Sequence, residues 1–191
     1  MNKVFQIDDN LFMSIQNFIS KYPFLDKIWI FLAQYLIYGV PVLLIVLWFW
    51  SVPAKKAAFK SVLAAVVAWL GFARIVAIIV NRPRPTQELL GAKELIFHRP
   101  DTSFPSDHAT MLFALAISLR LYGFKKLGNI LLIVATLVSI SRVFVGVHFP
   151  FDVIAGALLG SLVAVLFWSI REYIDKYLTN PIISVLKRIY L

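Results

Sequence analysis

The 191-residue chain contains no cysteine, and this absence excludes disulfide bonds and metal sites built from thiolates. Charged residues are also scarce, since only 15% of the chain is Asp, Glu, Lys or Arg, whereas 60% is hydrophobic. An ordinary soluble domain carries about 25% charged residues and about 50% apolar ones. The length fits one domain over residues 1–191, and the composition is typical of an integral membrane protein.

Acidic residues are few relative to basic ones, with 10 Asp and Glu against 19 Lys and Arg, which gives a formal net charge of +9. The basic residues are spread between apolar segments and do not form one patch. We therefore expect no nucleic-acid partner, because such a partner requires a clustered basic face. The basic residues are expected to set the membrane topology and to meet anionic membrane lipids.

The N-terminus lacks the continuous apolar core of a cleaved signal peptide, because Asp8, Asp9 and Asn10 interrupt it. Beyond them, apolar residues recur at helical spacing with polar residues between them: Leu11, Phe12, Ile15, Phe18, Ile19 and Tyr22. This pattern predicts an amphipathic helix. Two arrangements remain open, a helix lying in the membrane interface and a sixth helix packed across the bundle.

Five segments are apolar enough to cross a bilayer, which takes about 20 residues of helix. They are Ile28–Trp50, Ala57–Val80, Pro105–Tyr122, Asn129–Val147 and Phe149–Ile170. The third is short, and we expect its start to lie in a polar cavity, where it need not match the lipid. The predicted fold class is an all-α integral membrane bundle of about five transmembrane helices. The tail Arg171–Leu191, with Ile182, Ile183, Leu186 and Ile189, suits a further interfacial helix.

Basic residues accumulate in the first connection, in the third connection and after the last span: Lys55, Lys56, Lys60, Lys125, Lys126, Arg171, Lys176, Lys187 and Arg188. With five spans these regions share one side, which the positive-inside rule makes the cytoplasm. The long connection Asn81–Phe104 then lies outside, although it carries four basic residues of its own. On this topology Val80, Pro105, Val147 and Phe149 meet at the outer face.

The ionisable residues at this outer rim suit phosphate chemistry, and such residues at membrane depth are functional candidates because they are costly to place there. His148 and Asp152 are four residues apart and share a face in the first turn of a helix. A carboxylate on one ring nitrogen fixes the tautomer and leaves the other nitrogen as a nucleophile. Ser106 and His108 follow Pro105 at a predicted helix N-terminus, which attracts anions. Arginine forks such as that of Arg142 match phosphate oxygens.

These stretches resemble the motifs of the type-2 phosphatidic acid phosphatase superfamily, which includes membrane lipid phosphatases and vanadium haloperoxidases. Residues 141–152 match its pattern Ser-Arg-(five residues)-His-(three residues)-Asp throughout, and residues 105–108 match Pro-Ser-Gly-His with Asp107 in place of glycine. The pattern Lys-(six residues)-Arg-Pro keeps only its Arg-Pro, at Arg82-Pro83 and again at Arg84-Pro85, and Ile75 and Ala77 stand where lysine is expected. The resemblance covers residues 57–170, and a soluble haloperoxidase does not fit so apolar a chain.

The resemblance implies that His148 becomes a phosphohistidine, that Asp152 supports it and that His108 is the general acid. It implies that Ser106, Arg142 and one arginine of residues 82–85, for which we select Arg84, hold the phosphate, with no metal or other cofactor. The aspartate in the second motif and the missing lysine resemble bacterial undecaprenyl-diphosphatases. The expected activity is therefore hydrolysis of undecaprenyl diphosphate at the outer face of a bacterial plasma membrane.

The sequence leaves alternatives open for the substrate, for the class of function and for some residues. The substrate can instead be phosphatidate, phosphatidylglycerol phosphate or a lipid A phosphate, and a lipid acceptor can replace water. A different class of function is a small anion transporter in which Arg74 and Arg142 line the path. Arg74 is expected to pair inside the bundle rather than to replace the lysine, and His98 is expected to be a solvated loop residue. Asp107 either caps its helix or acts beside His108.

Overall fold

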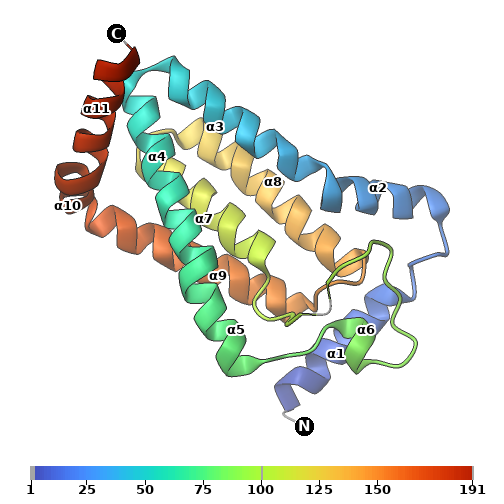
Figure 1. Ribbon diagram of the computed structural model, residues 1–191. Coiled ribbons are helices and arrows are strands. Elements are labelled where there is room, and N and C mark those ends of the chain that lie inside the picture. Colours follow the sequence, from blue (N-terminus) through green and yellow to red (C-terminus); the bar gives the residue numbers. More distant parts are fainter. Residues whose placement is uncertain (1–2, 100, 191) are drawn as a thin grey trace.

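The computed structural model describes residues 3–99 and 101–190, and this part of the chain is helical without any β-strand. The first long arm consists of α2 (Pro23–Gln34), a 3-10 turn at Leu36–Tyr38 and α3 (Gly39–Trp50). The second consists of α4 (Val52–Val66), a π-helical stretch at Val67–Ala73 and α5 (Arg74–Val80). The short α6 (Pro85–Glu88) follows, and then α7 (Asp107–Leu121), α8 (Lys125–Phe144) and α9 (Pro150–Ser169) complete the bundle (Figure 1).

Four helical segments of the described chain are long and apolar enough to cross a membrane: Pro23–Trp50, Val52–Glu88, Lys125–Phe144 and Pro150–Ser169. The shorter α7 lies in the middle of the bundle, where it packs against α4, α8 and α9 (Figure 1). Leu112 and Leu119 of α7 are fully buried. Because protein surrounds α7, its 15 residues need not match the thickness of the lipid. The predicted all-α membrane bundle of about five helices is confirmed.

The outer surface of the bundle is apolar. Large hydrophobic side chains are exposed on several of the long helices, among them Phe49 on α3, Ile78 on α5, Ile133 on α8 and Leu158 on α9. Contiguous exposed apolar surface is rare on soluble monomers but is what a lipid-facing helix requires. The exposed faces therefore agree with the membrane assignment made from composition.

Two glycines allow α7 and α9 to approach closely. A Cβ atom on Gly156 would lie 2.6 Å from the carbonyl oxygen of Ser106, and one on Gly160 would clash with the carbonyl oxygen of Thr110. Small residues at a helix interface permit this kind of backbone contact in membrane proteins. The first turn of α7 is consequently held against the first turns of α9, and the Ser106 N–H donates to the carbonyl oxygen of Asp152 over 3.0 Å.

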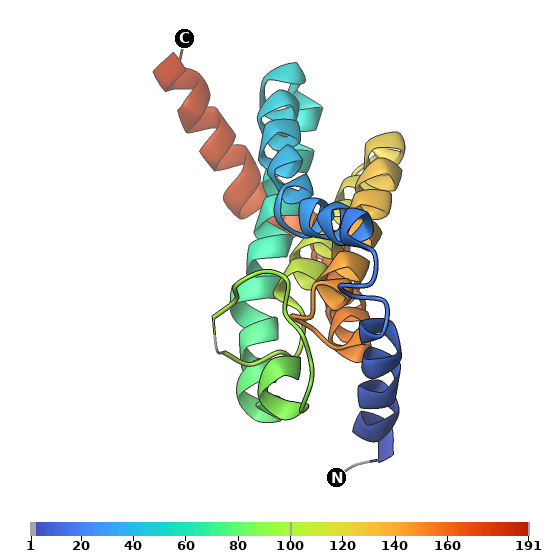
Figure 2. The same ribbon diagram turned by 90° about the vertical axis from the view of Figure 1, so that its right-hand side faces the viewer.

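The N-terminal α1 (Lys3–Gln16) packs on the ends of α8 and α9, at the opposite end of the molecule from α11 (Asn180–Tyr190) (Figures 1 and 2). Phe12 is fully buried against Val143 and Phe149, whereas the outer residue Leu11 is exposed. The helix is therefore amphipathic as predicted. It ends at Gln16 and does not continue to Tyr22, because the chain turns through the left-handed residue Ser20.

The C-terminal tail continues from α9 through α10 (Arg171–Ile174) and a π-helical stretch at Asp175–Thr179 into α11. Lys60 binds the Asp175 carboxylate over 2.9 Å, and Lys56 donates to Asn180 over 2.7 Å, so the tail is tied to α4. The junctions α3–α4 and α7–α8 lie near α11, opposite α1 and α6 (Figure 1). The predicted basic connections thus share one end. Leu191 and the side chains of Lys187, Arg188 and Ile189 lie outside the described part.

Candidate active site

The segment after α5 points two arginines in different directions. Asn81 ends α5 with a left-handed φ of 45°, and Pro85 opens α6 at its first position. Arg84 reaches the cavity described below, whereas Arg82 contacts Asp8 on α1. Both guanidinium groups are buried.

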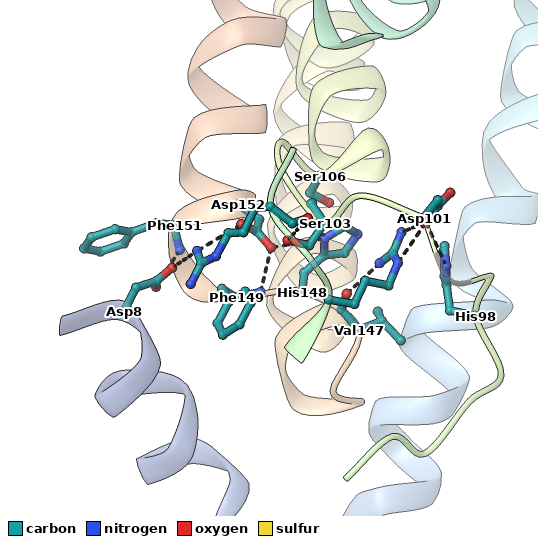
Figure 3. A network of polar contacts seen from close by, with 12 residues as sticks. Asp8, His98, Asp101, Ser103, Ser106, Val147, His148, Phe149, Phe151 and Asp152 are labelled. Atoms are coloured by element: carbon teal, nitrogen blue, oxygen red, sulfur yellow. Dashed lines mark hydrogen bonds and ion pairs between the residues drawn. The ribbon is translucent and has the colours of Figure 1, made fainter. Parts of the chain in front are cut away.

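His148 lies just before α9 and is almost completely buried. Its Nδ1 atom lies 2.9 Å from the carbonyl oxygen of Ser103 and 3.5 Å from Asp152 Oδ2 (Figure 3). Because a carbonyl oxygen can only accept, Nδ1 carries the hydrogen in this arrangement. Burial, together with the charges of Arg84 and Arg142, lowers the pKa of His148 well below its ordinary value. The ring is therefore neutral near pH 7, with a lone pair on Nε2.

Asp152 is held at the third position of α9. Its Oδ2 atom accepts the Phe149 N–H over 2.8 Å, which caps the helix, and Pro150 occupies the first helical position. Its Oδ1 atom accepts a hydrogen bond from Arg82 Nη1 over 3.3 Å. The carboxylate is fully buried, so these donors fix its orientation toward His148.

A cavity of about 270 Å³ brings the predicted chemistry together. His148, His108 and Arg84 line it, although they come from three separate parts of the chain. The remaining lining residues are Ile37, Trp69, His98, Arg99, Asp107 and Met111. Trp69 belongs to the π-helical stretch, a distortion that is frequent at functional sites. The start of α7 therefore lies at a polar cavity, as predicted.

Arg84 is fixed in place by two elements. Its Nη1 donates to the carbonyl oxygen of Val147 over 2.6 Å, while Nε and Nη2 donate to Asp101 Oδ1 over 2.9 and 2.6 Å. Burial raises the pKa of Asp101, but the hydrogen bonds and charge of Arg84 outweigh it and hold that pKa below the usual value. The positively charged guanidinium of Arg84 is thus held in a fixed position beside His108 and His148.

Ser106 and Arg142 are buried close to this cavity but are not among the side chains that line it. Ser106 Oγ and Arg142 Nε have no hydrogen-bond partner among the described residues. Arg142 Nη1 makes only a long contact, 3.4 Å, to the carbonyl oxygen of Ala33. Buried polar atoms are nearly always paired, so these two groups retain capacity to bind an anion.

Arg74 and Asp107 form an ion pair with 3.4 Å between Nη2 and Oδ2. Arg74 therefore has an acidic partner, as expected, but the pair is not inside the bundle, because the Arg74 side chain is 41% exposed and Asp107 lines the cavity. Asp107 lines the cavity next to His108, and Ser106, not Asp107, occupies the N-cap position of α7. Of the two interpretations of Asp107, its position favours a place beside His108.

Two residues of the loop before α7, His98 and Arg99, line the cavity although neither was predicted to do so. The expectation that His98 is solvated is wrong, because its side chain is only 20% exposed and its ring centroid lies 6.3 Å from that of His148. Arg99 follows it in the wall of the cavity. The path of this loop depends on tertiary contacts, such as the Leu95 N–H donating to the carbonyl oxygen of Val145 over 2.9 Å. No local pattern in the sequence indicates such contacts.

Comparisons with known proteins agree with this geometry. Residues 58–176 match the family model of the PAP2 superfamily. The chain is 34% identical over 166 residues to the bacitracin transport permease protein BcrC of Bacillus licheniformis, covering 86% of this chain and 81% of that protein. It is 28% identical over 181 residues to the undecaprenyl-diphosphatase BcrC of Bacillus subtilis, covering 94% and 90%. The crystal structure of Aquifex aeolicus LpxE superposes with a TM-score of 0.69 at 30% identity, covering 84% of this chain and 93% of that one.

Proposed function

The chain belongs to the PAP2 superfamily and is an integral membrane lipid phosphatase, and we propose that it converts undecaprenyl diphosphate to undecaprenyl phosphate. The observation that carries the proposal is the cavity in which two histidines and a fixed arginine meet. His148 presents Nε2 as a neutral nucleophile, because its Nδ1–H is engaged by the carbonyl oxygen of Ser103.

The reaction has two steps. His148 Nε2 attacks the terminal phosphorus, the bond from phosphorus to the bridging oxygen breaks, and His108 donates a proton to that oxygen as undecaprenyl phosphate leaves. Water then attacks the phosphohistidine, loses its proton to His108 and releases inorganic phosphate, which restores both histidines. Arg84, Arg142 and Ser106 stabilise the charge on the phosphoryl oxygens, and Asp152 stabilises the positive charge that develops on His148.

A second, apolar groove supports a lipid substrate. It has a volume of about 310 Å³ and lies between α3, α4 and α7, with Leu44, Val62 and Leu115 among its lining residues. Ile37 and Met111 line both this groove and the polar cavity. A phosphate headgroup in the cavity therefore leaves its hydrocarbon chain beside the groove. Arg99 and His98 add positive and hydrogen-bonding groups to the wall, which suits a headgroup of two phosphates.

Transport of an anion through the bundle is less well supported, although one relative is named a transport permease. A conducting path requires polar groups along its length. The main core between the two ends of this bundle is instead built from apolar side chains, including Leu47, Leu112, Leu119 and Val138. The cavity that contains the histidines lies at one end, which suits hydrolysis at a membrane surface.

The distribution of basic residues supports a proposed orientation in the membrane. Lys55 and Lys56 lie near the start of α4, and Lys125 and Lys126 are the first residues of α8. Both helices start at the end opposite the cavity (Figure 1), and the positive-inside rule assigns such an end to the cytoplasm. We therefore place the cavity at the outer face of a bacterial plasma membrane.

The test is phosphate release by the purified protein in detergent containing EDTA. Undecaprenyl diphosphate and farnesyl diphosphate are compared with phosphatidylglycerol phosphate and phosphatidate, with His148→Ala as the inactive control. We expect the diphosphates to be hydrolysed with the highest kcat/KM and without added metal. A clear preference for either monoester lipid would contradict the proposed substrate.

A further inference from the structure

Four carboxylate groups surround Arg82 on the side of His148 that faces away from the cavity. Arg82 Nη1 contacts both Asp8 and Asp152, the latter at 3.3 Å. Nη2 donates to Asp9 over 2.8 Å, and Nε lies 3.6 Å from Glu88. Figure 3 shows Asp8 and Phe151 on one side of Asp152 and His148 on the other. One guanidinium thus joins α1 to the aspartate beside the proposed nucleophile.

This cluster is buried. The Arg82 side chain is 3% exposed, and the Asp8 side chain is fully buried. The guanidinium also stacks on the ring of Phe149, with 3.5 Å from Cζ to the ring centroid. A buried ion is retained only where its partners replace the lost hydration, so these contacts depend on one another.

Asp8 also contacts the first turn of α9 directly. Its Oδ1 atom accepts the Phe151 N–H over 3.0 Å, and this N–H is one of those that a helix leaves unpaired at its start. Phe151 immediately precedes Asp152. Asp8 therefore holds both the backbone beside Asp152 and the guanidinium that contacts the Asp152 side chain.

The charge balance gives Asp8 a second effect on Asp152. One guanidinium cannot neutralise four carboxylates, and burial, together with the nearby charge of Asp152, raises the pKa of Asp8 despite the contact with Arg82. Because Asp8 and Asp152 share Nη1, Arg82 does not pair fully with Asp152. Oδ2 of Asp152 consequently remains directed at the Phe149 N–H and at His148 Nδ1.

We infer that Asp8 and Arg82 are positioning residues. Through them α1 holds Asp152 against His148 and leaves the negative charge of the Asp152 carboxylate only partly neutralised. The inference rests on the proposed role of His148 as nucleophile. Neither Asp8 nor Arg82 lines the cavity, so their loss slows the chemical step and leaves substrate binding nearly unchanged.

The test compares Asp8→Asn with Asp9→Asn in phosphate release from farnesyl diphosphate. Both changes remove one charge beside Arg82, but Asp9 has no hydrogen bond to α9 among the described contacts. We expect Asp8→Asn to lower kcat about 10-fold or more with KM within about twofold of the parent, because the loss lies in orientation. Asp9→Asn is expected to retain most of kcat. Asp26→Asn, which alters only the contact with Ser20, is the control with unchanged activity.

The pH profile separates positioning from simple stability. In Asp8→Asn one of the four negative charges around Arg82 is lost, so more of the charge of Arg82 acts on Asp152. This weakens the support for a protonated His148 and moves the acid limb of kcat to lower pH. The other groups facing His148 are unchanged in the variant: Arg84, His98, His108, Arg142 and Asp152. Equal losses in Asp8→Asn and Asp9→Asn, or an unshifted acid limb, would overturn the inference.

Arg82→Lys provides a second variant if Asp8→Asn does not fold. An ammonium group keeps the charge but cannot bridge both carboxylates as a fork does, so the same fall in kcat is expected. A kcat equal to that of the parent would overturn the inference. A parent protein that releases no phosphate from any lipid would instead contradict the proposed function itself.

Discussion

The Nδ1 atom of His148 lies closer to the carbonyl oxygen of Ser103, at 2.9 Å, than to Oδ2 of Asp152, at 3.5 Å. The carbonyl of the loop therefore fixes the tautomer of the ring, and the carboxylate acts mainly through its charge. This division of roles differs from a triad in which the carboxylate does both.

Asp152→Asn is consequently expected to be a partial defect. The amide keeps the size of the side chain and can still accept the Phe149 N–H, while Ser103 continues to hold the tautomer. We expect kcat to fall about 100-fold through the lost charge and yet to remain well above that of His148→Ala. Steady-state rates on farnesyl diphosphate measure this. Complete inactivity of a folded Asp152→Asn protein would show that Ser103 does not hold the ring.

The lowered pKa of His148 predicts the acid limb of the pH–rate profile. Protonation removes the lone pair on Nε2, so activity falls as the pH falls through the pKa of the folded protein. Because burial and the charges of Arg84 and Arg142 lower that pKa, the fall occurs below the ordinary histidine value of about 6.5. Measurement of kcat/KM between about pH 4.5 and pH 9 tests this. An acid limb centred above the ordinary value would contradict the burial of a neutral ring.

His108→Ala should distinguish between leaving groups. A lipid monophosphate is a good leaving group, whereas an alcohol needs a proton to depart, so the benefit of a general acid is larger for monoesters. We expect the variant to lose at least about 10-fold more kcat on farnesyl monophosphate than on farnesyl diphosphate. Equal losses on the two substrates would remove His108 from the role of general acid. The result is independent of which lipid is physiological, because both substrates carry the same hydrocarbon chain.

The bundle and the meeting of the two histidines were predictable from the sequence for simple reasons. Runs of about 20 apolar residues are visible in composition. Successive spans alternate in direction, so the third and the fifth, α7 and α9, start at the same face. The residue types at Ser106, His108 and His148 then indicate phosphate chemistry at that face.

The contacts that orient the site were not predictable. Arg82 and Asp8 are 74 positions apart, and their contact depends on how α1 docks on the bundle. In the sequence, Asp8 and Asp9 indicate only that a signal peptide is absent. The hydrogen bond from His148 to the carbonyl oxygen of Ser103 cannot be predicted from the sequence, because every residue has a carbonyl oxygen. Arg82 and Arg84 each precede a proline in the Arg-Pro repeat, so the sequence does not show that Arg84 reaches the cavity while Arg82 contacts Asp8.

The apolar groove predicts a dependence on lipid chain length. Val62 lies in its wall and is 37% exposed, so Val62→Trp fills the groove with little disturbance of the core. A long polyprenyl chain has more carbon atoms to place there than a short one. We therefore expect KM for undecaprenyl diphosphate to rise at least about 10-fold, while KM for a short-chain diphosphate such as geranyl diphosphate changes little.

The matched control for this variant is Ile133→Trp. Ile133 is an exposed residue on α8, away from the lining of both the groove and the cavity. It adds the same indole to the lipid-facing surface and is expected to leave both KM values unchanged. If Val62→Trp raised KM equally for the long and the short substrate, the groove would not hold the hydrocarbon chain. If Ile133→Trp produced the same selective rise, the effect would belong to insertion of the protein in detergent or lipid and not to the groove.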